Sequence, residues 1–80
     1  MNAETSQPDA EELAQFKAAV ASLRRLDREI FLARIRDKMT FDEIAAATGL
    51  SREEAMRRMA RAHIAVARFM AGRRSRWWRR

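Results

Sequence analysis

The chain has 80 residues, no cysteine, and 17 Lys and Arg against 11 Asp and Glu, which gives a formal net charge of +6. This length allows one small domain but not a core plus a catalytic cleft, so we expect a binding protein and not an enzyme. The lack of cysteine excludes a disulfide framework and a thiolate metal site, and no stretch of the sequence is long and apolar enough to span a membrane. Low Gly and Pro contents favour an all-α fold.

The N-terminal residues predict a leader followed by a helix. Residues 1–8 are polar, and we expect them to be disordered. A helical domain then spans residues 9–71. Its first helix is predicted to open at Asp9, which has capping-box spacing to Glu12, and to run to about Ser22. The apolar residues on one face of this helix are Leu13, Phe16, Val20 and Leu23.

A second helix is predicted at about residues 25–37. Its apolar residues are Leu26, Ile30, Phe31, Leu32 and Ile35. These positions point around most of the helix circumference, so we expect this helix to be the central one, covered on two sides.

Two capping boxes flank a glycine in the next stretch. Thr40 with Glu43, and Ser51 with Glu54, place a hydroxyl three residues before a Glu, which is typical of a helix start. Between them Gly49 can take the left-handed conformation that ends a helix. A short helix, a glycine turn and a longer Arg-bearing helix predict a helix-turn-helix.

The first helix of this motif is predicted at about 41–47 and is buried through Phe41, Ile44 and Ala45. The second helix is predicted to start after Ser51 and to continue to about Ala71, where Gly72 ends it. Small Ala45 would allow a tight crossing. The inward-facing stripe of the second helix is predicted to be Ala55, Met59, Ala62, Val66 and Phe69.

The opposite face of this helix carries Glu53, Arg57, Ala60, Arg61 and Ile64, with Met56 on one flank. The N-terminal part of such a face meets base edges. Arg52 and Arg57 are therefore candidates for base contact, because Arg can bind guanine O6 and N7 with two donors. Arg61 lies farther along and would contact phosphate.

The alternative is a solvated face held by two i, i+4 ion pairs, Glu53 with Arg57 and Glu54 with Arg58, worth about 0.2–0.5 kcal/mol each. The two Glu residues also occupy the first helical turn, where they oppose phosphate binding. Glu53 could accept from cytosine N4, whereas Glu54 is predicted to cap. We therefore expect low intrinsic DNA affinity.

Four segments, D27-REIF-L32, M39-TFDEI-A45, G49-L-S51 and R58-MAR-A62, together resemble region 4 of bacterial sigma factors over roughly residues 20–70. The similarity is greatest to the extracytoplasmic-function group, especially the iron-transport type, where a similar M-A-R-A run closes the recognition helix. The DNA-binding domains of two-component regulators share part of this skeleton but usually lack the Arg-x-x-Arg-Ala ending.

The resemblance implies recognition of the promoter −35 element in the major groove and docking on the β-flap of RNA polymerase, in the cytoplasm at the nucleoid. No segment corresponds to region 2, so we expect a stand-alone domain that needs a partner: polymerase, a separate region 2-like protein, or a second copy. The alternative is a protein-interaction regulator that binds the flap or an anti-sigma factor with little DNA recognition. The predicted DNA-binding residues are Thr40, Ser51, Arg52, Glu53, Met56, Arg57 and Arg61.

The segment 72–80 is a basic tail that contains Arg73, Arg74, Arg76, Trp77, Trp78, Arg79 and Arg80. Cations beside stacking rings suit contact with nucleic acid. A solubilising end, with or without the Trp pair folded back, and adsorption to a membrane surface are the alternatives. His63 is the only histidine and is expected on the helix surface; we predict no metal, cofactor or small-molecule substrate.

Overall fold

The computed structural model describes residues 10–78, with side chains for residues 10–72. Four helices make up this part of the chain, with no strand in it: α1 (Ala10–Ala21), α2 (Arg25–Ile35), α3 (Phe41–Thr48) and α4 (Arg52–Trp78). The predicted all-helical, four-helix fold is confirmed. The expected leader, the cap at Asp9 and the side chains of the basic tail lie outside the described residues. None of the helices described here is long and apolar enough to cross a membrane.

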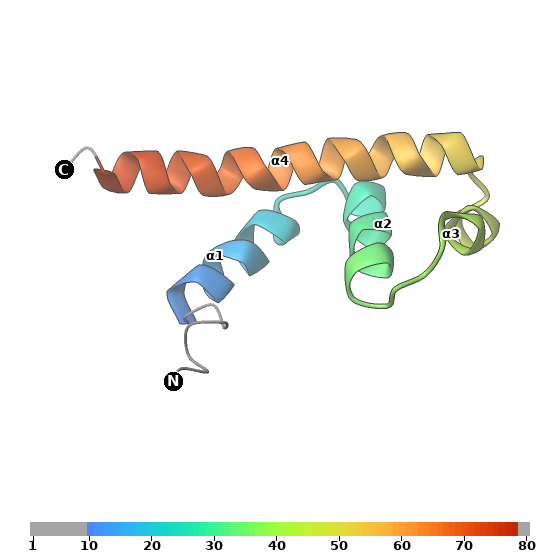
Figure 1. Ribbon diagram of the computed structural model, residues 1–80, viewed down its shortest axis with the longest axis horizontal. Helices are drawn as coiled ribbons and strands as arrows, with labels where there is room; N and C mark the ends of the chain where they lie inside the picture. Colours follow the sequence, from blue (N-terminus) through green and yellow to red (C-terminus); the bar gives the residue numbers. More distant parts are fainter. Residues whose placement is uncertain (1–9, 79–80) are drawn as a thin grey trace.

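Helix α4 is the element on which the other three pack (Figure 1). Its 27 residues give a length of about 40 Å, enough to contact α1, α2 and α3 in succession. Helix α2 also packs against α3. As the sequence pattern predicted, α2 is covered by α1 on one side, through Phe16 and Phe31, and by α3 and α4 on another. The surface common to the other three helices is nevertheless that of α4 and not that of α2.

The core forms where α1, α2 and α3 meet α4. Ile30 of α2 and Ile44 of α3 are the largest fully buried side chains, and burial of such a side chain contributes about 1.5–3 kcal/mol. The rings of Phe16 and Phe31 join α1 to α2 with centroids 6.1 Å apart. The predicted inward stripe of α4 is confirmed: Ala55, Met59, Ala62 and Val66 are buried, and half-buried Phe69 packs against them.

The connection between α2 and α3 is a tight turn that contains a left-handed residue. Lys38 has φ 58°, and the next amide, that of Met39, donates to the Ala33 carbonyl at 3.0 Å. Arg34 Nη1 donates to the Met39 carbonyl at 2.8 Å, and its guanidinium lies 4.7 Å from the centroid of the Phe41 ring. One arginine of α2 thus fixes both the turn and the start of α3.

The C-terminal part of α4 differs from its prediction. The helix was expected to end at Gly72, but it continues to Trp78. A glycine within a helix costs about 1 kcal/mol relative to alanine, which does not by itself end the helix. Among the described residues only Gly49 and Lys38 adopt positive φ, so Gly72 lacks the left-handed conformation of a C-terminal cap.

Substitution of Met59 by Asp should abolish the cooperative thermal melt, because it places an unpaired charge where the native side chain is only 6 % exposed. Met56→Asp is the matched control, since Met56 lies one turn earlier on α4 and is 43 % exposed. Circular dichroism melts should show a normal transition for Met56→Asp only. A normal melt for Met59→Asp would contradict the position of α4 in the core.

Candidate nucleic-acid interface

The turn between α3 and α4 is fixed by hydrogen bonds that are local in sequence. At the start of α3, the Thr40 amide donates to Glu43 Oε1 at 2.8 Å and the Glu43 amide donates to Thr40 Oγ1 at 3.1 Å, which completes the predicted capping box. Gly49 takes the predicted left-handed conformation with φ 78°. Thr48 Oγ1 donates to the Ile44 carbonyl at 2.8 Å. The direction in which α4 leaves α3 is therefore set by the chain between residues 40 and 51.

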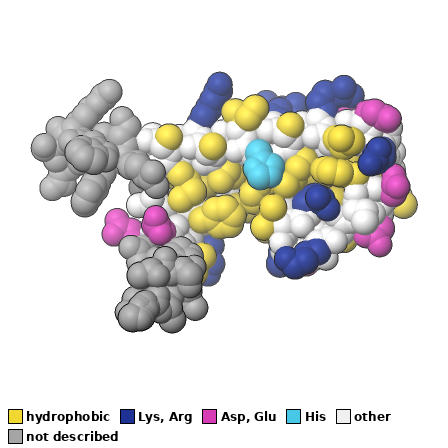
Figure 2. Space-filling model, in the orientation of Figure 1, with side chains coloured by type: hydrophobic (Ala, Val, Ile, Leu, Met, Phe, Trp, Pro, Cys, Tyr) yellow, Lys and Arg dark blue, Asp and Glu magenta, His cyan; other side chains and the backbone are white. Residues whose placement is uncertain are grey.

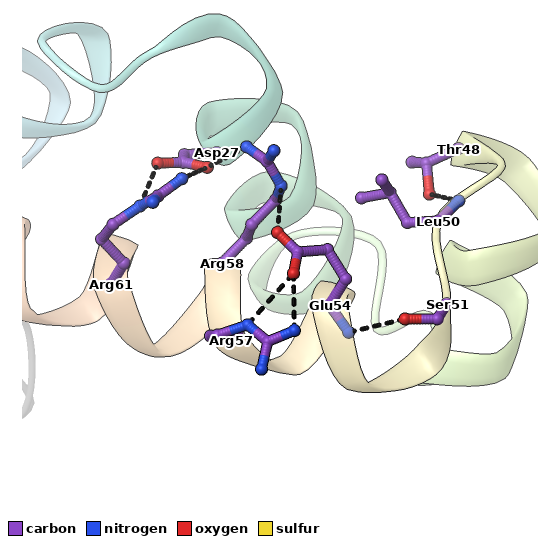
Figure 3. A network of polar contacts seen from close by, with 8 residues as sticks. All are labelled: Asp27, Thr48, Leu50, Ser51, Glu54, Arg57, Arg58 and Arg61. Carbon is purple, nitrogen blue, oxygen red and sulfur yellow. Dashed lines mark hydrogen bonds and ion pairs between the residues drawn. The ribbon is translucent and has the colours of Figure 1, made fainter.

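The start of α4 has only half of its predicted capping box. Ser51 Oγ accepts from the Glu54 amide at 3.0 Å, as the sequence predicts. The Glu54 carboxylate, however, turns forward along the helix to Arg57 and Arg58 (Figure 3). Arg57 donates two hydrogen bonds to this carboxylate and Arg58 forms an ion pair with it. These charged partners compete with the backbone amide of Ser51, and charged donors make the stronger hydrogen bonds.

Glu54 is the acceptor for Arg57 on the exposed side of α4. Arg57 Nε and Nη2 donate to Glu54 Oε1 at 3.0 and 2.7 Å, and Arg58 Nε lies 3.1 Å from Oε2. The hydrogen bonds from Arg57 lower the pKa of Glu54 below its ordinary value, against the opposing effect of desolvation. The predicted pair of Glu54 with Arg58 is confirmed, but Arg57 pairs with Glu54 and not with Glu53 as predicted.

Arg52 makes a contact across the turn. Its Nε lies 3.3 Å from Asp42 Oδ1, so this exposed ion pair joins the first turn of α4 to the first turn of α3. Exposed pairs of this kind contribute about 0–1 kcal/mol. Arg52 can therefore leave Asp42 for a stronger anionic partner.

Asp27 is the residue of this region that the sequence did not identify. It lies in the first turn of α2 and is only 4 % exposed. Arg61 Nε donates to its Oδ2 at 3.1 Å and Arg61 Nη2 to its Oδ1 at 3.1 Å, while Arg58 Nη1 donates to Oδ1 at 3.2 Å (Figure 3). Desolvation by burial would raise the pKa of Asp27, but the hydrogen bonds and charges of Arg61 and Arg58 outweigh it and lower the pKa below its ordinary value.

The sequence around Asp27 indicates a buried carboxylate. Asp27 falls among the apolar residues of its helix, next to Leu26 and one turn before Ile30 and Phe31. A carboxylate on a buried face needs a cationic partner. The partner pair, Arg58 and Arg61, has the i, i+3 spacing that places both residues over one site.

The predicted DNA-binding residues fall into three groups in the structure. Four are exposed on the first two turns of α4, and these are Arg52, Glu53, Met56 and Arg57. Thr40 and Ser51 are also exposed, but their hydroxyls accept the capping bonds. Arg61 is 53 % exposed at its side chain, and it turns toward α2, where Asp27 holds it. The face of α4 opposite its buried stripe is therefore only partly available to a ligand, because Arg61 on that face is bound by Asp27.

The first three turns of α4, together with the two carboxylates of other helices that pair with its arginines, carry no net charge. Acidic and basic side chains alternate at the α3 end of the molecule (Figure 2). The four arginines of this region are Arg52, Arg57, Arg58 and Arg61, and its four carboxylates are Asp27, Asp42, Glu53 and Glu54. Equal numbers of the two signs give little long-range attraction for a polyanion.

His63 takes part in packing. It is exposed, as predicted (Figure 2). The rings of His63 and Phe31 meet edge to face, with their centroids 5.4 Å apart. Within the described residues no three His, Cys, Asp or Glu side chains gather as they would around a metal ion.

Comparison with known proteins gives the family. Residues 13–63 match the family model described as "Sigma-70, region 4". A search of curated proteins and a search of solved structures each returned no match. The matched segment covers more than half of the chain and includes α2, α3 and the turn between α3 and α4. The chain belongs to the sigma-70 region 4 family, and this membership implies a role in transcription initiation through DNA or RNA polymerase.

Replacing Asp27 by Asn should lower the free energy of unfolding by about 2–3 kcal/mol at neutral pH, because it removes the charge that Arg58 and Arg61 share. The pKa of Asp27 is lower in the folded state than in the unfolded chain. Its stabilisation is thus complete above the ordinary carboxyl pKa of about 4 and is lost as the pH falls through the folded value.

Urea unfolding at pH 7 and at pH 3 tests this expectation. The wild-type protein should lose more stability on acidification than Asp27→Asn, so that the difference between the two narrows at pH 3. Asp37→Asn is the control, since Asp37 pairs with Arg36 at an exposed position. Equal stabilities of Asp27→Asn and Asp37→Asn at pH 7 would contradict a structural role for Asp27.

Proposed function

We propose that the exposed first two turns of α4 read DNA in the major groove, at a promoter element of the −35 type. The observation that carries this proposal is the family membership, together with the exposure of Arg52, Glu53, Met56 and Arg57 just after a capped turn. Helices α3 and α4 would then act as a helix-turn-helix. Arg57 can bind guanine with two donors, and Glu53 can accept from cytosine N4.

The proposal includes a protein partner. A single module of this kind buries about 600–1,000 Å² on DNA, and the neutral surface at the start of α4 adds little electrostatic attraction. Binding to the β-flap of RNA polymerase would supply the missing affinity by raising the effective concentration at the promoter. A separate region 2-like protein is the other partner we consider. Such a role is a binding function without catalysis, and it would place the protein in the cytoplasm at the nucleoid.

The finer assignment within the family follows from sequence. The run Met59–Ala62 resembles the end of the recognition helix in extracytoplasmic-function sigma factors of the iron-transport type. We propose this subgroup for the chain.

A second function is favoured by the charge balance. Each of the four arginines at the start of α4 lies within ion-pair distance of a carboxylate of the same chain, which weakens attraction to phosphate. Met56 and Ile64 are exposed apolar side chains on α4 that could contact another protein. The domain would then bind the polymerase flap or an anti-sigma factor with little DNA recognition.

Replacing Arg57 by Ala should change sequence preference and cost about 1–3 kcal/mol on the preferred duplex, because it removes a base contact. Arg61→Ala should weaken binding to all sequences alike if Arg61 contacts phosphate. Since Arg61 also binds Asp27, each variant is first melted to confirm that it is folded. Titration on matched and scrambled duplexes makes the measurement. Equal, small losses on both duplexes for Arg57→Ala would favour the protein-interaction function.

Deleting residues 73–80 removes five arginines and both tryptophans. If the arginines contact phosphate, the slope of log affinity against log salt should flatten by up to about 0.9 per lost contact on duplex DNA. The slope is measured from titrations between 50 and 200 mM salt, the range in which such contacts lose most affinity. An unchanged slope would exclude phosphate contact. Co-sedimentation with anionic liposomes that the deletion abolishes would indicate a membrane surface instead.

A further inference from the structure

The exposed arginine in the middle of the proposed DNA-reading surface is already bound by its own helix. Arg57 donates from Nε and Nη2 to Glu54 Oε1 at 3.0 and 2.7 Å. These two donors lie on the same edge of the guanidinium plane. An arginine that binds guanine with two hydrogen bonds also needs a pair of donors presented in one plane. The Glu54 carboxylate therefore occupies one of the donor pairs with which Arg57 could bind a base, and it holds the guanidinium against the helix.

The position of Glu54 is fixed independently of Arg57. Its amide is capped by Ser51 Oγ at 3.0 Å, and its other carboxylate oxygen lies 3.1 Å from Arg58 Nε. Arg58 is in turn held by the buried Asp27 at 3.2 Å. If Arg57 swings away, Glu54 keeps a cationic partner and its place on the helix. Arg57 is therefore the member of this cluster that can be exchanged.

The exposure of the side chains separates the two kinds of arginine. The Arg57 side chain is 72 % exposed, whereas that of Arg58 is 26 % exposed. Exposed ion pairs are weak because water screens them, and buried ones are expensive to break. A DNA phosphate or base edge can thus take Arg57 from Glu54 but cannot take Arg58 from Asp27.

We propose that Glu54 acts as an internal competitor that holds Arg57 away from DNA and so sets the DNA affinity of the domain. This inference rests on the proposed DNA-binding function. In the free protein Arg57 is bound to Glu54, and in the complex DNA replaces that carboxylate. Glu54 tunes the affinity and does not block binding, because the pair it makes is exposed.

The chain offers a matched pair of variants for the test. Glu54→Gln and Glu53→Gln each remove one negative charge from the first turn of α4. Both variants keep the hydrogen bond from the backbone amide of residue 54 to Ser51 Oγ. Within residues 10–72, Glu53 takes part in no ion pair. The two variants are compared on a scrambled duplex, where the proposed contact of Glu53 with cytosine contributes to neither. On that duplex both variants should gain affinity from the lost repulsion of phosphate. Glu54→Gln should bind about two- to fivefold more tightly than Glu53→Gln, which corresponds to the usual strength of an exposed pair.

The same comparison in an Arg57→Gln background isolates the competition. Without Arg57, Glu54→Gln and Glu53→Gln should bind DNA equally well. Equal affinities of the two variants in the presence of Arg57 would overturn the inference. An advantage of Glu54→Gln that persists without Arg57 would also overturn it.

A measurement without DNA separates failure of this inference from failure of the proposed function. In nitrogen–proton NMR spectra, the Arg57 Nε–H signal should exchange with water more slowly in the wild type and in Glu53→Gln than in Glu54→Gln. Equal exchange rates in the wild type and in Glu54→Gln would overturn the inference alone. If the signals behave as expected but no variant binds any duplex above background, the DNA-binding function itself is wrong and the inference falls with it.

Discussion

The buried carboxylate of Asp27 is the constraint on which the arrangement of α2 and α4 depends. A carboxylate that is 4 % exposed is tolerated only if its charge is compensated and its lone pairs are used. Arg58 and Arg61 meet both needs, and both come from α4. Apolar contacts such as those of Ile30 would tolerate a small rotation of α4, because dispersion has no preferred direction. Three hydrogen bonds to one carboxylate do not, so Asp27 fixes both the crossing of the helices and the rotation of α4 about its axis.

The rotation of α4 about its axis decides which of its arginines face outward, where they can contact another molecule. With Arg58 and Arg61 turned toward α2, Arg52 and Arg57 are left on the outer side of the first two turns of α4. Arg52 lies beside the exposed Asp42, and Arg57 lies beside the half-buried Glu54. Buried pairs persist because separating them leaves an uncompensated charge, and exposed pairs exchange because water and salt screen them. One helix therefore carries two structural arginines and two exchangeable ones, although composition and spacing make the four look alike.

The features that sequence predicted correctly are those determined within a few residues or by a simple period. The capping box of Thr40 and Glu43 and the left-handed turn at Gly49 involve groups at most four residues apart. The buried stripe through Met59 follows from helical periodicity. The apolar neighbours of Asp27 indicate a buried carboxylate, but its role was missed because the two arginines that compensate its charge lie 31 and 34 residues away in the chain. The end of α4 was misplaced because a glycine ends a helix only when it adopts the left-handed conformation, and Gly72 does not.

The neutral charge of the α4 start has a consequence for specificity. Non-specific DNA affinity comes almost entirely from phosphate neutralisation, and a surface with four arginines and four carboxylates supplies little of it. If the domain reads DNA as proposed, base contacts would form a larger share of the remaining affinity, so the ratio of specific to non-specific binding would be high while both would be weak. A domain of this kind would gain from a second contact that brings it to its site, because a raised effective concentration multiplies specific and non-specific affinity by the same factor and leaves their ratio unchanged. In the proposed DNA-binding function, the weak arginine–carboxylate pairs of α4 and a protein partner would act together: the partner would supply affinity, and the exposed side chains of α4 would supply discrimination between sequences.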